Sequence, residues 1–440
     1  MHMFRRLAIP MLALVSIGLA LPPAAASPGD TLWTKTYDGP SSGTDTPRDM
    51  VIDPVQYRLY VVGTSEDGTS TDMVTIAYDL YTGSKIWARR YDGPAHGADL
   101  GVAISYDPYS RGVTVTGATE EVAGSGRIDA VTISYLLDGS RQWTRRITNP
   151  DTDLPAALTV VDGSTYVLVH GGHGRLIAYD PGGMRRWARD VTTGQLAEAV
   201  DLQSIGDYLL AVGRNQNATG TAILTTAFRT DGSAVWTDRF AGPVHDAVAA
   251  DAAIGAHGST LYVTGAYSDG TSRKITTIAY DPHDGHRFWR RSIPPQAPSE
   301  VDLRPHIAVS EDGGSIAVAM GSQLNNVYTF LTRQYHSDGS VAWTARENGP
   351  NDAGQVADVA IGLGTGTVYV TGSGTNTNAA QGPFTVGYTL AGPPSQFETA
   401  IPPIDLADGA TCLVPGPFGD RVFVGSRVGG DIRVDAYAAY

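Results

Sequence analysis

The chain has 440 residues but a single cysteine, Cys412, so no intrachain disulfide can form and core packing must hold the fold. Cys412 lies in an apolar run, which favours a buried small hydrophobic residue over a nucleophile. Basic residues are also few, because 31 Lys and Arg stand against 45 Asp and Glu and give a formal net charge of −14. Binding to phosphate requires neutralisation by Lys and Arg, so this charge argues against nucleic acid as a partner.

Long apolar runs are confined to the N-terminus. Residues 7–21 are apolar, follow Arg5 and Arg6, and precede the small residues Ala24–Ala26, which is the arrangement of a secretory signal peptide. The run is shorter than the roughly 20 residues needed to span a bilayer. We therefore expect a signal peptide over residues 1–26, no membrane span, and a protein secreted to the extracellular space or cell envelope. Both general and twin-arginine export fit the two arginines.

Tryptophan is rare and regularly spaced. Seven tryptophans recur at intervals of 44 to 56 residues, each within a degraded copy of the stretch Ala77–Trp87, and a phenylalanine takes the same place in an eighth copy. These aromatics, which we expect to dock neighbouring blades, are Trp33, Trp87, Trp143, Trp187, Trp236, Trp289, Trp343 and Phe397. A period near 50 residues made of short β-rich segments is typical of a propeller or another solenoid.

One repeat contains four strands. Between Asp49 and Tyr91, four short runs rich in Val, Ile, Thr and aromatics are each bounded by Gly, Pro or Asp. Second and third strands can be counted eight times, and seven fourth strands follow third strands. The eighth fourth strand, Leu32–Tyr37, has no repeat before it, and the last repeat has only three strands. A closed ring, in which this strand pairs with the run near Ile432–Tyr437, removes the exposed edges of an open array. The sequence predicts an all-β, eight-bladed propeller of four-stranded antiparallel blades, formed by residues 27–440 as one domain.

The turn before the tryptophan carries a family resemblance. Ala77-x-Asp79-x-x-Thr82-Gly83-x-x-x-Trp87 resembles the tryptophan-docking motif of the quinoprotein (PQQ)-like repeat superfamily, which includes quinoprotein dehydrogenases and BamB-type scaffolds. The resemblance implies eight blades, a tight Asp-Gly turn, and an indole buried against a neighbouring blade. Quinone-dependent members use a calcium ion, a catalytic aspartate and often adjacent cysteines. This chain has no Cys-Cys pair and no long insertions, and fold alone does not fix chemistry.

A basic residue lies two positions after the tryptophan in five copies, on the same face of the strand. These residues are Lys35, Arg89, Arg145, Arg189 and Arg291. A basic binding stripe is one explanation. We favour a structural one, in which the side-chain stem covers the blade junction and the charged end stays hydrated or pairs with a carboxylate.

The loops from second to third strand and from fourth to the next first strand should share one face, here called the loop face, and their variable polar sequences favour binding there. A carboxylate precedes or begins every first strand. These residues are Asp49, Asp99, Asp153, Glu198, Asp246, Asp302, Asp352 and Asp408. Because first strands surround the axis, the carboxylates are candidates for an acidic ring that binds Ca²⁺ or a cationic or hydroxyl-rich ligand. Turn capping is the simpler explanation, and we favour it.

The remaining candidates are His170, His173 and Arg214, all in loop-face segments. The two histidines have no third ligand nearby in sequence, so a metal site is not favoured. No common catalytic or phosphate-binding motif is present, and no catalytic, cofactor or metal residue is assigned. The sequence thus predicts a secreted, non-enzymatic, monomeric propeller that recognises an extracellular protein or glycan. The alternative is a secreted propeller enzyme, either a quinone-dependent oxidoreductase or a polysaccharide-acting hydrolase or lyase.

Overall fold

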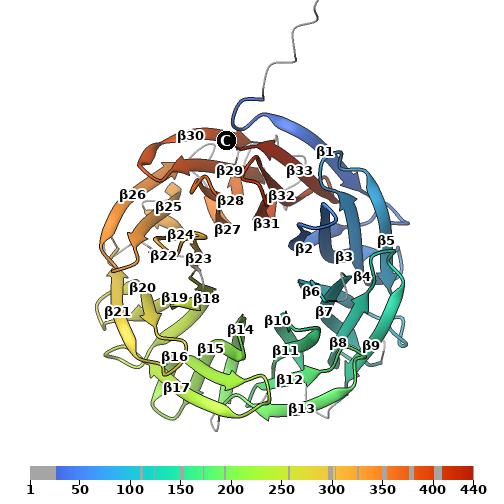
Figure 1. The fold of residues 1–440 in the computed structure, drawn as a ribbon, viewed down its shortest axis with the longest axis horizontal. Helices are drawn as coiled ribbons and strands as arrows, with labels where there is room; N and C mark the ends of the chain where they lie inside the picture. Colours follow the sequence, from blue (N-terminus) through green and yellow to red (C-terminus); the bar gives the residue numbers. More distant parts are fainter. Residues whose placement is uncertain are drawn as a thin grey trace, which may run out of the picture.

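The computed structural model describes residues 26–109, 112–122, 124–148, 153–171, 173–192, 195–255, 258–295, 301–302, 304–324, 327–348, 354–375, 381–400 and 409–439. Eight antiparallel sheets stand around a central axis, with the first strand of each innermost and the fourth outermost (Figure 1). The predicted all-β, eight-bladed propeller is therefore confirmed. The described part of the chain holds no helix long and apolar enough to cross a membrane. The proposed signal peptide lies almost entirely outside the described residues.

The blades follow one another along the chain. Blade 1 comprises β2 (Asp45–Asp53), β3 (Arg58–Glu66), β4 (Thr71–Asp79) and β5 (Lys85–Tyr91), and blade 2 comprises β6 (Asp99–Asp107), β7 (Gly112–Glu120), β8 (Ile128–Tyr135) and β9 (Arg141–Ile147). Blade 3 comprises β10 (Leu154–Val161), β11 (Ser164–His170), β12 (Arg175–Tyr179) and β13 (Arg185–Asp190), and blade 4 comprises β14 (Gln195–Ile205), β15 (Tyr208–Asn217), β16 (Gly220–Arg229) and β17 (Ala234–Phe240). Blade 5 comprises β18 (Ala247–Ile254), β19 (Leu261–Ser268), β20 (Arg273–Tyr280) and β21 (Arg287–Ile293). In blade 6 the first strand is divided into β22 (Val301–Asp302) and β23 (His306–Val309), followed by β24 (Ser315–Leu324), β25 (Val327–His336) and β26 (Val341–Asn348). Blade 7 comprises β27 (Gly354–Ile361), β28 (Val368–Thr375), β29 (Gln381–Thr389) and β30 (Gly392–Ala400).

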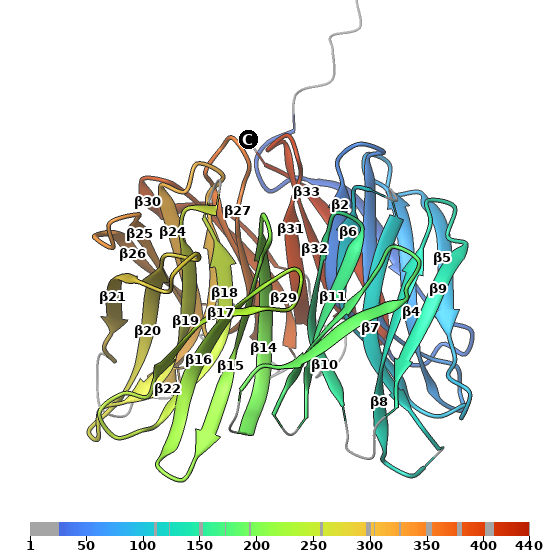
Figure 2. The same cartoon turned by 60° about the horizontal axis from the view of Figure 1, so that its bottom comes forward.

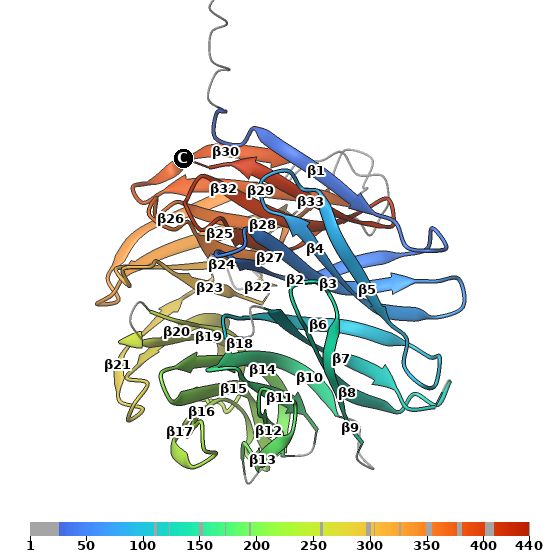
Figure 3. The ribbon, with the colours of Figure 1, turned by 45° about the vertical axis from the view of Figure 1, so that its right-hand side comes forward.

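Blade 8 closes the ring. It comprises β31 (Gly409–Pro415), β32 (Arg421–Val428), β33 (Asp431–Ala438) and, as its outer strand, β1 (Thr31–Tyr37). β1 runs antiparallel to β33, with Trp33 opposite Ala436 and Tyr37 opposite Ile432 (Figure 3). This is the predicted closure, in which the first strand of the described chain completes the sheet formed by its last three.

The tryptophans join each blade to the next. All seven indole N–H groups donate to a carbonyl in the turn between the third and fourth strands of the following blade, for example Trp87 Nε1 to Leu137 O at 2.9 Å. The turn glycine lies against the indole with a positive φ, as Gly139 does at 75° beneath Trp87. The hydrophobic clusters accordingly combine side chains of two neighbouring blades. The core of the molecule thus lies at the blade junctions; the side chain of Phe397 is outside the described residues.

The structural explanation for the basic residues after the tryptophans is confirmed in four blades, with a different partner from the one expected. Arg89 Nε donates to Gly139 O at 2.7 Å and Arg291 Nε to Gly339 O at 2.7 Å, and Arg145 and Arg189 make the same bond. The guanidinium therefore binds the backbone carbonyl of the turn glycine, where we had expected water or a carboxylate. These arginines reinforce the tryptophan contact and do not form a free basic stripe.

Candidate functional site

The predicted loop face exists. Backbone bonds join the end of the second strand to the segment that leads into the first strand, as in Glu66 N to Thr44 O at 3.1 Å and Glu120 N to Ala98 O at 3.0 Å. The strands of every blade run between this face and the opposite one (Figure 2). Loops from neighbouring blades therefore meet on one surface.

The carboxylates chosen from the sequence lie in different settings. Asp99 and Asp153 are buried where one blade leads into the next, and Asp99 Oδ2 accepts the Gly93 N–H at 2.6 Å, which is the turn capping that we favoured. Asp49 lies deeper, inside the first strand of blade 1. Asp352 and Asp408 fall outside the described residues, as does the side chain of Asp302.

Arginines neutralise the carboxylates of blades 4 and 5. Glu198 lies 2.9 Å from Arg304 Nη2 and 3.8 Å from Arg214 Nε, and Asp246 lies 3.9 Å from Arg273 Nη1. Arg214 is therefore an ion-pair partner of Glu198. Because opposite charges lie so close, this side of the loop face offers a mixed surface and not a continuous acidic one.

The two histidine candidates do not come together. His170 ends β11 and its Nδ1 atom is buried without a hydrogen-bond partner of acceptable geometry, whereas His173 is exposed. His173 lines a cavity of about 640 Å³ between blades 3 and 4, together with side chains of β16 and β17. Among the described residues, neither histidine belongs to a group of three metal-ligating side chains.

A cleft of about 500 Å³ lies on the loop face between blades 1 and 2. It is lined by Glu66, Gly68, Thr69, Ser70, Thr71, His96, Gly97, Ala98, Glu120 and Gly124. Ala98 is the only apolar side chain among them, and carboxyl, hydroxyl and imidazole groups supply the polar part of the cleft wall. We call this site the blade 1–2 cleft.

Hydrogen bonds fix the loops that form the cleft. Glu66 Oε2 accepts the Thr44 N–H at 2.9 Å, and Glu120 Oε1 accepts the Gly126 N–H at 3.0 Å. That bond is the largest of several backbone bonds that lower the pKa of Glu120. Glu120 is therefore charged at neutral pH, and both carboxylates hold the loops that form the cleft.

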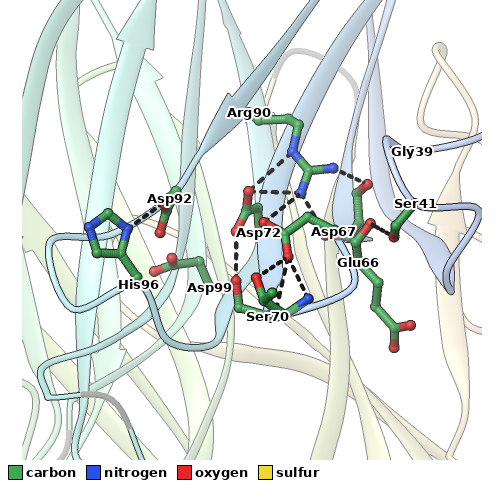
Figure 4. Close-up of polar contacts among 12 residues, drawn as sticks. Gly39, Ser41, Glu66, Asp67, Ser70, Asp72, Arg90, Asp92, His96 and Asp99 are labelled. Carbon is green, nitrogen blue, oxygen red and sulfur yellow. Dashed lines mark hydrogen bonds and ion pairs between the residues drawn. The ribbon is translucent and has the colours of Figure 1, made fainter.

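Three further carboxylates, Asp72, Asp92 and Asp99, lie next to the cleft with ligand atoms within 4.8 Å of one another (Figure 4). Two basic groups oppose them, since Arg90 Nη2 lies 2.8 Å from Asp72 Oδ2 and His96 Nδ1 lies 2.6 Å from Asp92 Oδ2. The hydrogen bond to Asp92 raises the pKa of His96, whereas burial raises the pKa of Asp99. The cleft therefore has a negative wall whose charge is partly balanced by its own side chains.

Sequence reasoning missed a second set of residues inside the first strands. In each first strand one residue lies at a β-bulge or, in the divided strand of blade 6, at the corresponding position. These positions hold Asp49, Ala103, Ala157, Asp201, Asp251, His306, Asp358 and Cys412. In all of them but Asp201 the residue stands before two apolar residues separated by one position. The sequence had singled out only Asp49, as a candidate ligand residue, and Cys412, as a buried hydrophobic residue.

These aspartates connect blades. Asp49 accepts the N–H of Met50 at 2.8 Å and that of Ile104, in the next blade, at 3.0 Å. Asp251 and Asp358 make the corresponding pairs of bonds, whereas Asp201 accepts from Leu202 and from the Gln203 side chain. Burial raises the pKa of Asp49 to about 6 and that of Asp358 to about 7. Backbone N–H groups and, at Asp201, the Gln203 amide donate to these carboxylates, which indicates a structural role.

The comparisons with known proteins agree with this architecture. Residues 24–219 match a family model described as outer membrane protein assembly factor BamB. The quinohemoprotein alcohol dehydrogenase of Comamonas testosteroni superposes with a TM-score of 0.52 at 12% identity, over 93% of this chain and 76% of that one. The resemblance to the quinoprotein-like eight-bladed propellers is confirmed.

Propellers outside this family superpose on the chain as well. Sqt1 of Chaetomium thermophilum, solved with the N-terminus of ribosomal protein L10, gives a TM-score of 0.60 at 12% identity, over 93% of this chain and 100% of that one. Sqt1 of Saccharomyces cerevisiae gives 0.60 at 9% identity, over 94% and 100% of the two chains. No curated protein matches the sequence. At such identities the structural likeness establishes the fold alone.

Proposed function

We propose that this protein is a secreted, non-enzymatic binding protein whose loop face holds an extracellular protein or glycan, with the blade 1–2 cleft as the main contact. The observation that carries the proposal is the composition of that cleft. Sites for small molecules are mostly apolar, whereas this one is lined by carboxylates, hydroxyls and glycines. Such a surface suits a ligand that presents hydroxyl, amine or guanidinium groups.

Two further observations support the proposal. A structural neighbour, Sqt1, was solved with the N-terminus of another protein bound, so propellers of this shape can hold a peptide. Residues 1–26 have the charge, apolar length and small-residue site of a secretory signal. The secretion part is tested by N-terminal sequencing of the protein from culture supernatant, which we expect to begin at Ser27.

The binding part is tested by probing the mature protein against a glycan array and a panel of purified cell-envelope proteins. In a ligand-binding assay Thr69→Arg, which places a long cation in the blade 1–2 cleft, should weaken binding at least about tenfold because it neutralises and fills the cleft. Thr365→Arg is the matched control, since Thr365 lines a cleft of about 390 Å³ on the opposite face. Equal loss in both variants, or turnover of a substrate without any stable binding, would contradict the proposal.

A further inference from the structure

The segments that lead into blades 1 and 2 are two copies of one local structure. Both read Tyr-Asp-Gly-Pro-x-x-Gly-x-Asp, over residues 37–45 and 91–99. In both, the N–H of the first glycine donates to Oδ2 of the final aspartate at 2.6 Å, from Gly39 to Asp45 and from Gly93 to Asp99. The sixth residue has the same left-handed conformation, with φ of 49° at Ser42 and 50° at His96. The two segments can therefore be compared position by position.

Each copy gathers three carboxylates. Asp38, Asp45 and Asp431 form one group and Asp92, Asp99 and Asp72 the other, and in each group the ligand atoms lie within 4.8 Å of one another. Asp45 and Asp99 are 0% and 1% exposed. Their Oδ1 atoms are buried without a hydrogen-bond partner of acceptable geometry among the described residues, although the hydroxyls of Ser65 and Thr119 lie beside them.

The blade 2 copy contains its own cations. Arg90 binds Asp72 through Nε at 3.1 Å and Nη2 at 2.8 Å, and His96 Nδ1 lies 2.6 Å from Asp92 Oδ2. The contact with Asp92 raises the pKa of His96, which favours the positively charged imidazolium next to the Asp92 carboxylate. Side chains thus balance much of the charge of this triad.

The blade 1 copy lacks both cations. Thr36 stands where Arg90 does, three residues after the tryptophan, and Ser42 stands where His96 does. Ser42 Oγ donates to Asp38 Oδ2 at 3.2 Å, which adds an oxygen but no charge. Arg433, on the same strand as Asp431, is bound to Asp435 through Nε at 2.8 Å.

The three carboxylates repel one another, and the one cation whose charge acts on Asp45, Arg90, is bound to Asp72 and reaches Asp45 only through the Ser65 hydroxyl. Among the described residues, no Lys, Arg or His forms an ion pair with Asp38, Asp45 or Asp431. Burial, followed by the charges of Asp38 and Asp45, raises the pKa of Asp431. A bound cation would supply the missing charge.

We propose that Asp38, Asp45 and Asp431 hold a divalent cation, Ca²⁺, at the junction of blades 8 and 1. Ca²⁺ prefers carboxylate, hydroxyl and water oxygens in flexible geometry, and the group offers three carboxylates beside the Ser42 hydroxyl. Extracellular modules bind Ca²⁺ with dissociation constants of about 10⁻⁴ to 10⁻³ M, which suits a partly exposed site. The site joins the outer strand of the closing blade to the start of blade 1, and it does not depend on the ligand proposed for the cleft.

Calorimetric titration of the chelator-treated mature protein with CaCl₂ tests the proposal. We expect one Ca²⁺ per chain and a rise in melting temperature with Ca²⁺. Asp38→Asn should weaken binding at least tenfold, whereas Asp92→Asn, the same change at the equivalent position of the other copy, should leave affinity and stoichiometry unchanged. The melting temperature of each variant without Ca²⁺ shows whether it is folded.

Exchanging the cations between the copies gives a sharper test that removes no carboxylate. Thr36→Arg with Ser42→His should abolish Ca²⁺ binding, and Arg90→Thr with His96→Ser should raise the stoichiometry from one to two. The proposal is overturned if the wild type shows neither binding heat nor a melting shift up to about 10 mM Ca²⁺. It is also overturned if Asp92→Asn loses the ion while Asp38→Asn retains it.

Discussion

At the scale of single residues, the contact between turn glycine and tryptophan is the unit from which the ring is built. The sequence predicted the participants, because Gly and Trp recur at a fixed offset within each repeat. It did not predict which blade each indole meets, since the glycine beneath Trp87 is Gly139, in the next repeat. Direction around the ring depends on sheet twist and packing, which a spacing of about 50 residues does not encode.

Gly139→Ala should destabilise the protein more than Gly206→Ala. Both glycines have positive φ, 75° and 53°, so an alanine costs roughly 1 to 2 kcal/mol in backbone strain at either position. A Cβ on Gly139 would also lie 2.7 Å from Trp87 Cδ2, whereas one on Gly206 meets nothing within 4 Å. We expect overpacking to add roughly 1 to 3 kcal/mol at Gly139.

Denaturant unfolding followed by tryptophan fluorescence measures the difference between the two variants. Gly206→Ala gives the cost of backbone strain alone, and the excess in Gly139→Ala gives the cost of displacing the indole. Equal unfolding midpoints would show that Trp87 moves aside freely, which disagrees with a tightly packed junction.

At the scale of elements, the first strands carry the part of the structure that the sequence described least well. The alternation of side chains along a strand predicts the face of the sheet on which each one lies only when the strand pairing is regular. A bulge moves every later residue of the strand to the other face. The bulges before Asp49, Asp201, Asp251 and Asp358 direct these carboxylates toward the next blade. Counting from the start of each strand therefore selected, with the exception of Asp49, different carboxylates from those that link the first strands.

These aspartates predict a pH dependence of stability. Burial raises the pKa of Asp358 to about 7 from its ordinary value of 3.8, and the charge of Asp49 is a further, smaller cause. The folded protein therefore holds this proton more tightly than the unfolded chain does. The resulting stability is fully present below the unfolded pKa and is lost as the pH rises through about 7. The stability that Asp358 contributes therefore declines from about pH 4 to about pH 7. Burial lowers the pKa of His306, in the neighbouring blade, to about 4, so His306 opposes this decline up to about pH 6.5. We expect the fall in melting temperature to be clearest above about pH 6.5 and to end near pH 8.

Asp358→Asn isolates this group. The amide should cost stability at pH 6.5, because its NH₂ group faces the N–H of Val359 or Leu413, but it removes one titration and so reduces the decline toward pH 8. Asp138→Asn is the control, since Asp138 is exposed and its pKa is lowered by the Ser140 hydroxyl and N–H. Differential scanning calorimetry across the pH range measures both, and an unchanged slope in Asp358→Asn would show that another group titrates.

At the scale of the whole molecule, the sequence predicted the architecture well, but it did not show which side chains the ring brings together. The number of blades and the closure of the ring follow from counting repeats, because each repeat buries its apolar side chains only by packing against the repeats on either side. Sites arise where repeats differ. Thr36 and Arg90 occupy equivalent positions, yet only Arg90 neutralises a carboxylate triad, and that triad combines Asp72 of one blade with Asp92 and Asp99 from the segment beyond it. Such groups form only when the ring places the segments together.

Closure itself can be tested by removing β1. A chain that starts at residue 39 leaves β33 with an unpaired edge and loses the packing of Trp33, whose removal alone should cost roughly 3 to 5 kcal/mol. We expect a lower melting temperature and self-association through the exposed edge, both measured by calorimetry with light scattering. A chain that starts at Thr31 is the control. Adding a synthetic peptide of Thr31–Tyr37 to the shortened chain should restore part of the lost stability, because the peptide can take the place of β1. If the shortened chain melts like the control and stays monomeric, the pairing of β1 with β33 contributes little, and the stability of the ring must come from the other seven blades.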